Sequence, residues 1–199
     1  MKTNSRKGRA AFTLIELMAV ITIIVILAGL VVGGLGYVSE KQASSKAKVQ
    51  IALLSKALEE YKLDMGNYPA TANSTTGTGT SAIYLYQALF KEGYDYTTAA
   101  TPPTTWVNKA TKIYLPELDP RTSKQGWVDV VTATTPPLST TVKDPWGNEY
   151  RYRTAKTLAG VANTDYMNPD FDLWSCGKDG LTNPASPADT KNRDDIKNF

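Results

Sequence analysis

A single carboxylate stands directly before the longest apolar run of this chain. Residues 17–38 are apolar or small apart from Thr22, and Glu16 precedes them. As a helix, this run would rise about 33 Å, enough to cross a hydrocarbon core of about 30 Å. A charge at the edge of such a span costs free energy unless a partner neutralises it, so we predict a function for Glu16.

A basic leader precedes the run. The first 11 residues contain four Lys and Arg residues and no acidic residue. Positive charges ahead of an apolar span favour a cytoplasmic N-terminus, so the rest of the chain is expected across the membrane, in a periplasm if the cell has one. An ordinary secretory signal is the alternative. Its apolar region is usually about 7–15 residues long and is followed by the cleavage site, whereas this run is longer and the acidic residue precedes it.

The composition argues against nucleic-acid binding and against histidine-dependent chemistry. The net charge of +3 over 199 residues becomes −1 without the four basic residues of the leader, so we expect no nucleic-acid partner. The chain has no histidine, which excludes Ser-His-Asp and Cys-His catalysis and His-ligated zinc. Its one cysteine, Cys176, excludes an intramolecular disulfide, and burial is the ordinary expectation for a free thiol.

The apolar run is predicted to continue into an amphipathic helix. Apolar residues recur in steps of three and four, which is the period of one helix face. These residues are Ala47, Ile51, Leu54, Leu58, Tyr61 and Met65. The simplest interpretation is packing of this stripe against a sheet. One helix over 12–65 is therefore expected, ending at about 66 because Gly66 and Pro69 follow.

The rest of the chain indicates loops, a short helix and a small sheet. Residues 70–80 are polar, and residues 81–91 favour a short helix with Ser81 as its N-cap. Residues 95–142 are predicted to be extended, with short strand pieces and exposed Thr, Tyr and Trp side chains. Turn formers followed by alternating tyrosines make residues 144–153 the clearest strand signal, and residues 171–175 are a second strand candidate. The predicted fold class is α+β, with a long N-terminal helix on a small antiparallel sheet.

The N-terminal motif Phe12-Thr13-Leu14-Ile15-Glu16 resembles that of the type IV pilin and type II secretion pseudopilin superfamily. The resemblance implies cleavage between Ala11 and Phe12 by a prepilin peptidase and N-methylation of Phe12. Ala11 stands where the superfamily usually has Gly. Cleavage would create an α-amino group four residues from Glu16, and in a helical assembly that amine is expected to neutralise Glu16 of a neighbouring copy.

The C-terminal part resembles the major (G-type) pseudopilins of type II secretion. The matching segments are Asp144-Pro145-Trp146-Gly147-Asn148, residues 171–180, and Asp194-Asp195-Ile196. The resemblance implies a type IV pilin-like fold and a non-enzymatic subunit of a periplasmic pseudopilus. Its implied partners are further copies of itself, minor pseudopilins and an inner-membrane assembly platform. The chain would divide into a leader at 1–11, an assembly helix at 12–38 and a periplasmic domain at 39–199. That domain would have a variable region at 67–142 and a sheet with a C-terminal loop at 143–199.

The same resemblance implies a calcium site in the C-terminal loop. The implied ligands are the side chains of Asp179 and of Asp194 or Asp195, with the backbone carbonyls of Leu173 and Ser175. Oxygen ligands of this kind suit calcium, which is a hard cation. The family's glycine-rich loop is replaced here by residues 181–187. Turn-forming aspartates at a solvated surface are the alternative.

Other functions remain open from the sequence. A type IV pilin of a surface pilus is the alternative to the secretion pseudopilin. A membrane-anchored hydrolase could use a carboxylate pair, either Asp170 with Asp172 or Asp194 with Asp195. A ligand-binding domain on a membrane anchor would be a stable monomer that tolerates loss of Glu16.

Overall fold

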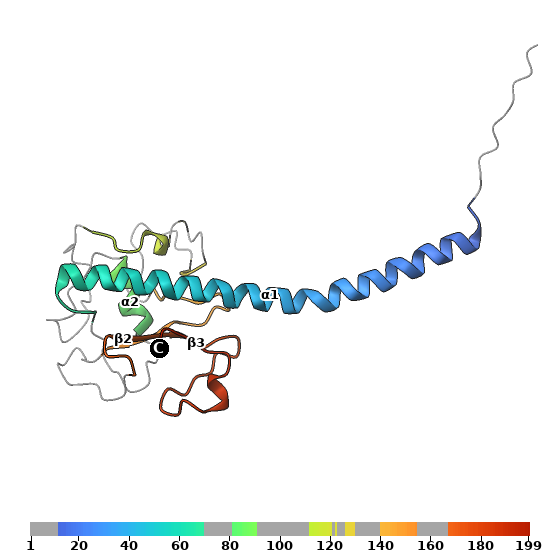
Figure 1. Ribbon diagram of the computed structural model, residues 1–199. Coiled ribbons are helices and arrows are strands. Elements are labelled where there is room, and N and C mark those ends of the chain that lie inside the picture. The colour runs from blue at the N-terminus through green and yellow to red at the C-terminus, as the bar shows by residue number, and fades with distance from the viewer. Residues whose placement is uncertain are drawn as a thin grey trace, which may run out of the picture. The chain divides into compact units, whose positions relative to one another are not determined.

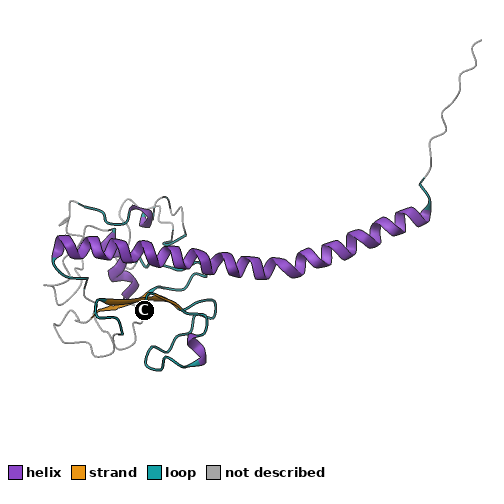
Figure 2. Ribbon diagram, viewed as in Figure 1, coloured by secondary structure: helices purple, strands orange, loops and turns teal. Residues whose placement is uncertain are grey.

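A computed structural model describes most of the chain (Figures 1 and 2). The described residues are 12–69, 81–90, 112–120, 122, 126–129, 140–154 and 167–199. The chain divides into two compact units, Met1–Gln42 and Ala43–Phe199. The leader, the polar segment 70–80 and most of 95–142 lie outside the described residues, so the predictions for them stay predictions.

Helix α1, Leu14–Met65, confirms the long helix expected over 12–65. It ends where the sequence predicts. Gly66 has a φ of +82° and its N–H donates to the Lys62 carbonyl at 2.8 Å. Because a left-handed backbone costs little only for glycine, Gly66 stops the helix while satisfying one of its last carbonyls.

The first unit holds the apolar half of α1. Every side chain described between residues 12 and 42 is exposed, although most of those up to residue 38 are apolar. Among the described residues, α1 is the one helix that is long and apolar enough to span a membrane, with a mean hydropathy of 2.9 over its most apolar window. This half of α1 therefore has the length and composition of a membrane segment, as predicted.

The second unit has its own core, built around the amphipathic half of α1. The predicted stripe is buried from Ala47 to Tyr61, and Met65 is partly buried against the core. The stripe packs with side chains of α2 and of the sheet, including Leu85, Tyr152 and Leu173.

A polar residue of α1 also lies in this core. Gln50 is buried, and its Oε1 accepts a hydrogen bond from the Tyr150 hydroxyl at 2.8 Å. The apolar pattern of the helix does not reveal this link between α1 and the residues before β1.

Over the described residues, the sheet has three antiparallel strands in the order β1-β2-β3. Strand β1 is Arg151–Thr154, β2 is Phe171–Ser175 and β3 is Ile196–Lys197. The strand expected at 171–175 is confirmed at its bounds, and the signal over 144–153 corresponds to a turn followed by β1. Strand β3 was not predicted because two residues show no alternation.

Helix α2, Ser81–Leu89, packs on β1 and confirms the short helix expected at 81–91. Ser81, the expected N-cap, is the first helical residue, and its Oγ accepts a hydrogen bond from the Tyr152 N–H at 3.3 Å. This residue therefore ties α2 to the sheet.

The described residues between 112 and 142 correct one expectation. Tyr114 and Trp127 were expected to be exposed with their neighbours, but both are buried and belong to the core. Large aromatic side chains gain most from burial, and a Thr- and Pro-rich composition hides this. In place of the expected strand pieces, these described residues contain one regular element, the 3-10 helix η1 at Pro116–Leu118.

Candidate functional site

Glu16 closes the first turn of α1 on itself. Its Oε2 accepts hydrogen bonds from the Thr13 N–H and the Thr13 hydroxyl, both at 2.9 Å. The Glu16 N–H donates back to Thr13 Oγ1 at 3.3 Å. This is a capping box, in which the N-cap residue and the residue three positions later satisfy each other's donors.

The capping box gives the Glu16 carboxylate a partner before any neighbour arrives. One oxygen is occupied by Thr13, so the other oxygen remains for a cationic group. We did not predict the contact with Thr13, although the spacing Thr-x-x-Glu is its sequence signal. Phe12, which precedes the box, is exposed. Ala11 lies outside the described residues.

The turn after β2 brings two of the predicted cation ligands together. Asp194 Oδ2 accepts hydrogen bonds from the backbone N–H groups of Lys178 and Asp179, at 2.7 and 3.1 Å. Asp179 Oδ1 accepts from the Leu181 N–H at 2.8 Å. Gly177 has a φ of +64°, and a Cβ there would collide with Asp194. A glycine at 177 is therefore required for the close approach of Asp194.

Asp195, the third predicted carboxylate, occupies a different environment. Its side chain is fully buried, and its Oδ2 accepts from the Thr182 hydroxyl at 2.9 Å and lies 3.4 Å from Lys197 Nζ. Among the residues that the structure describes, Asp195 Oδ1 has no hydrogen-bond partner. Burial raises the pKa of Asp195, against the opposing effect of the Thr182 hydrogen bond and of Lys197.

The two predicted carbonyl ligands belong to β2. The Leu173 carbonyl accepts a hydrogen bond from the Asn198 N–H at 3.1 Å, and Ser175 pairs with Ile196 of β3. Within the described ranges, no group of three or more His, Cys, Asp or Glu side chains is arranged to hold a metal. A cation here would therefore draw on carbonyl or water oxygens as well as carboxylates.

A turn before β1 supports the end of β2. Asp144 is buried, and its Oδ1 accepts from the backbone N–H groups of Trp146 and Asn148 at 3.0 and 2.8 Å. Its Oδ2 accepts from the Ser175 hydroxyl at 2.6 Å, and Asn148 Nδ2 donates to the Gly177 carbonyl at 2.7 Å. The sequence marked these residues as a turn but gave no sign of their contacts across the sheet.

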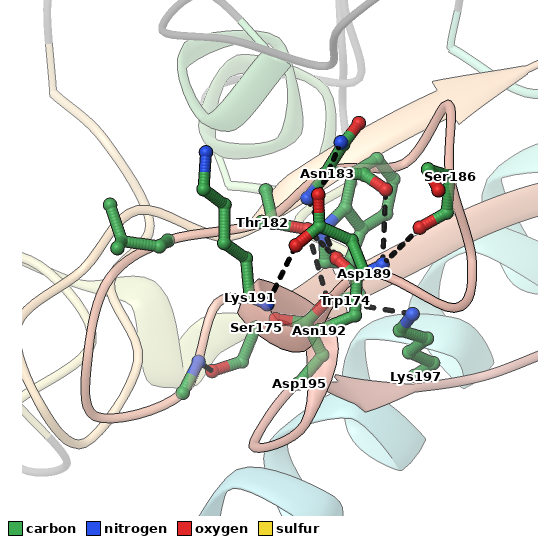
Figure 3. Close-up of polar contacts among 12 residues, drawn as sticks. Trp174, Ser175, Thr182, Asn183, Ser186, Asp189, Lys191, Asn192, Asp195 and Lys197 are labelled. Atoms are coloured by element: carbon green, nitrogen blue, oxygen red, sulfur yellow. Dashed lines mark hydrogen bonds and ion pairs between the residues drawn. The ribbon is translucent and has the colours of Figure 1, made fainter.

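The loop that follows the turn after β2, from residue 181 to 192, is held together by its own side chains (Figure 3). Asn192 Oδ1 accepts from the Asn183 N–H at 2.7 Å, and Asn192 Nδ2 donates to the carbonyls of Asn183 and Ser186 at 3.0 and 2.8 Å. Asn183 Nδ2 donates to Asp189 Oδ2 at 2.7 Å. Since the chain cannot form a disulfide, this network provides a clamp for its C-terminal segment.

The residues of the hydrolase alternative have separate structural partners. Asp172 is fully buried and forms an ion pair with Arg153, whereas Asp170 is exposed and pairs with Lys62. Asp194 bonds backbone N–H groups, whereas Asp195 bonds the Thr182 hydroxyl. Cys176 is buried as expected, and burial raises the pKa of its thiol.

Comparison with known families identifies two matching regions. Residues 36–109 match the family described as type II secretion system, protein G. Residues 6–32 match the prokaryotic N-terminal methylation motif.

Two related proteins match over most of the chain, and a third matches over a shorter region. The type II secretion system core protein G of Escherichia coli strain K12 is 32% identical over 148 residues, which cover 74% of this chain and 72% of the relative. The Vibrio cholerae serotype O1 protein of the same name is 33% identical over 73% of this chain and 71% of its own length. The Aeromonas hydrophila protein is 46% identical over a shorter region, 33% of this chain and 46% of the relative.

Proposed function

This chain belongs to the protein G family of the type II secretion system, the major pseudopilins, and we propose that it is cut between Ala11 and Phe12 and polymerises through α1. Proteins of this family are structural pseudopilins. In the proposal, a prepilin peptidase removes the basic leader and Phe12 becomes the N-methylated first residue. The chain then forms a pseudopilus that helps to drive protein export, and it carries no catalytic activity of its own.

The observation that carries this proposal is the exposed apolar half of α1. Large apolar side chains from Phe12 to Val38 lie half exposed or more, from 50% at Val20 to 84% at Phe12. Such a surface is unfavourable in water and is stable in lipid or among the helices of other copies. A helix that leaves the membrane to pack among identical helices accounts for both environments.

We also propose a location and partners for the chain, from its basic leader, its apolar helix and its relatives. The chain would span the inner membrane once, with the leader in the cytoplasm and residues 39–199 in the periplasm. The basic leader supports this orientation. Further copies, minor pseudopilins and an inner-membrane assembly platform would be its partners in the periplasmic pseudopilus. The two relatives that match over more than two thirds of their length are named type II secretion proteins, which favours this function over a surface type IV pilin.

Glu16 is proposed to set the register of the assembly. Thr13 occupies Glu16 Oε2, and the amine of Phe12 from a neighbouring copy would neutralise the carboxylate. Packing of identical copies that repeats head to tail without closing produces a filament. The hydrogen bonds of the capping box would thereby offset part of the free-energy cost of placing the Glu16 carboxylate in hydrocarbon.

The test substitutes Glu16→Ala and follows membrane insertion, leader cleavage and fibre formation separately. We expect insertion and cleavage to proceed and fibres to be lost. Glu40→Ala is the matched control, because Glu40 is an exposed carboxylate of the same helix beyond the apolar run. Normal fibres from the Glu16 variant would overturn the register proposal.

Calcium binding at the C-terminal turn is a second part of the proposal. The unpartnered and buried Oδ1 of Asp195 supports it, because an orphaned carboxylate oxygen in the protein interior is costly. Asp179 would contribute the second carboxylate, with Asp194 as the alternative to Asp195, and carbonyl oxygens of Leu173 and Ser175 would be further ligands. A bound cation would tie the C-terminal segment to the sheet.

Thermal unfolding of the full chain in detergent micelles tests this proposal. Calcium is expected to raise the Tm relative to EGTA, because a ligand that binds only the native state stabilises it. The Asp179→Ala variant should lose the shift. Asp129→Ala should keep it, since Asp129 is an exposed carboxylate that pairs with Lys143. No shift in the unsubstituted chain would remove calcium from the proposal.

A further inference from the structure

We infer that Thr182 is a positioning residue for the cation: its hydroxyl, oriented by the Trp174 indole, holds the buried Asp195 carboxylate so that one oxygen stays available. This inference rests on the calcium site proposed above. It concerns the loop in which this chain departs from the glycine-rich sequence of the pseudopilins it resembles. Thr182 lies in that replacement loop and hydrogen-bonds both Trp174 and Asp195, which Figure 3 draws together with it.

The direction of the hydrogen bonds follows from their chemistry. Trp174 Nε1 lies 3.1 Å from Thr182 Oγ1, and an indole N–H can only donate. The hydroxyl therefore accepts from Trp174, and its single hydrogen is left for an acceptor. Asp195 Oδ2 lies at 2.9 Å, whereas the other acceptor in reach, Asn192 Oδ1, lies at 3.5 Å. The hydroxyl consequently donates to Asp195.

This relay of hydrogen bonds, from Trp174 through Thr182 to Asp195, reaches only one of the two carboxylate oxygens of Asp195. Oδ2 accepts a hydrogen bond from the Thr182 hydroxyl and lies 3.4 Å from Lys197 Nζ, whereas Oδ1 is buried and has no partner in the described part of the chain. An ionised carboxylate offers several acceptor positions, and a buried one without partners is destabilising. A cation at Oδ1 would supply the missing interaction. The orphaned oxygen therefore points to a ligand independently of the acidic residues nearby.

The position of Thr182 is set by the protein itself. Its neighbour Asn183 is bonded through its backbone N–H and carbonyl to the Asn192 side chain, at 2.7 and 3.0 Å. The same side chain reaches the Ser186 carbonyl at 2.8 Å. Because these bonds are made by amide groups of the chain, the loop can hold Thr182 before a cation arrives. A group that orients a metal ligand typically changes metal affinity about 10- to 100-fold when it is removed.

The test is calorimetric titration of the full chain in detergent micelles with calcium chloride. Thr182→Val keeps the shape of the side chain and removes the hydroxyl, so we expect calcium affinity to fall about tenfold or more. Thr182→Ser restores the hydroxyl and should keep affinity within about twofold of the unsubstituted chain. Thr190→Val is the matched control, since Thr190 lies just after the replacement loop, in the 3-10 helix Thr190–Asn192, and hydrogen-bonds Asp189.

The outcomes separate this inference from the calcium proposal. Calcium binding by the unsubstituted chain with equal affinity in Thr182→Val would overturn the positioning role alone, as would equal losses in the Val and Ser variants. No calcium binding by the unsubstituted chain would overturn both. Should Thr182→Val fail to fold, Trp174→Phe keeps an aromatic ring and removes the indole N–H. It is expected to weaken calcium binding, and unchanged affinity would overturn the relay.

Discussion

Arg153 Nε and Asp172 Oδ2 lie 2.7 Å apart at facing positions of β1 and β2, and both side chains are buried. Asp172 also accepts hydrogen bonds from the backbone N–H groups of Met167 and Asn168, at 2.9 and 2.8 Å. The guanidinium lies over the Trp174 ring, 5.2 Å from its centroid. This ion pair therefore joins two strands and the segment that leads into β2.

Loss of one partner of this buried ion pair should destabilise the fold far more than loss of one partner of an exposed pair. Asp172→Ala leaves the Arg153 charge buried without compensation, which typically costs about 3–5 kcal/mol. Asp170→Ala removes the exposed partner of Lys62 and should cost less than about 1 kcal/mol. Urea unfolding of both variants checks the difference. Similar free energies of unfolding would show that the buried pair contributes no more than the exposed one.

The buried Asp144 carboxylate predicts a second destabilising substitution. Asp144→Asn keeps the size of the side chain but replaces one acceptor oxygen with a donor group, facing either backbone N–H groups or the Ser175 hydroxyl. An unsatisfied buried polar group of this kind costs about 1–3 kcal/mol. Asp129→Asn, at an exposed carboxylate, is the control. Denaturant midpoints measure both, and an unchanged midpoint for Asp144→Asn would contradict this role.

Two glycines with left-handed backbones offer a matched comparison. Gly147 has a φ of +91° and open space where a Cβ would lie, whereas at Gly177 a Cβ would meet the side chain and carbonyl of Asp194. Both Ala substitutions carry a backbone cost of about 1–2 kcal/mol. Gly177→Ala should lose about a further 1–3 kcal/mol because the crowded turn must shift. Thermal unfolding distinguishes the two variants. Equal losses of stability would show that Asp194 can move away from the new Cβ at little cost.

Two tyrosines near the end of α1 predict how stability depends on alkaline pH. Burial, with hydrogen bonds to Glu59 and Asp64 respectively, raises the pKa of Tyr68 and of Tyr114 to about 12. The unfolded chain releases these protons at about pH 10, so the stability they contribute is present below pH 10 and is lost as pH rises toward 12. Tyrosinate absorbance of the folded chain should show late titration, and Tyr68→Phe should remove one late group. Titration of every tyrosine at about pH 10 would contradict this prediction.

The long helix and its buried stripe were predictable because each depends on nearby residues. A run of apolar side chains requires a non-aqueous environment, and steps of three and four require one buried helix face. Gly66 marks the helix end for an equally local reason, since its backbone has a positive φ. Strand β2 was predicted at its bounds from its own residues.

The sequence by itself therefore determined the apolar helix, its amphipathic continuation and the strand at 171–175. Only the tertiary structure decided which distant groups meet. Asp144 and Ser175 are 31 positions apart, and Thr182 and Asp195 are 13 apart. The burial of Trp127 and the pairing of β3 depend in the same way on separate segments. Periodicity reports the environment of neighbouring residues, whereas these contacts arise when burial of the core closes long loops and brings particular polar groups within hydrogen-bond distance.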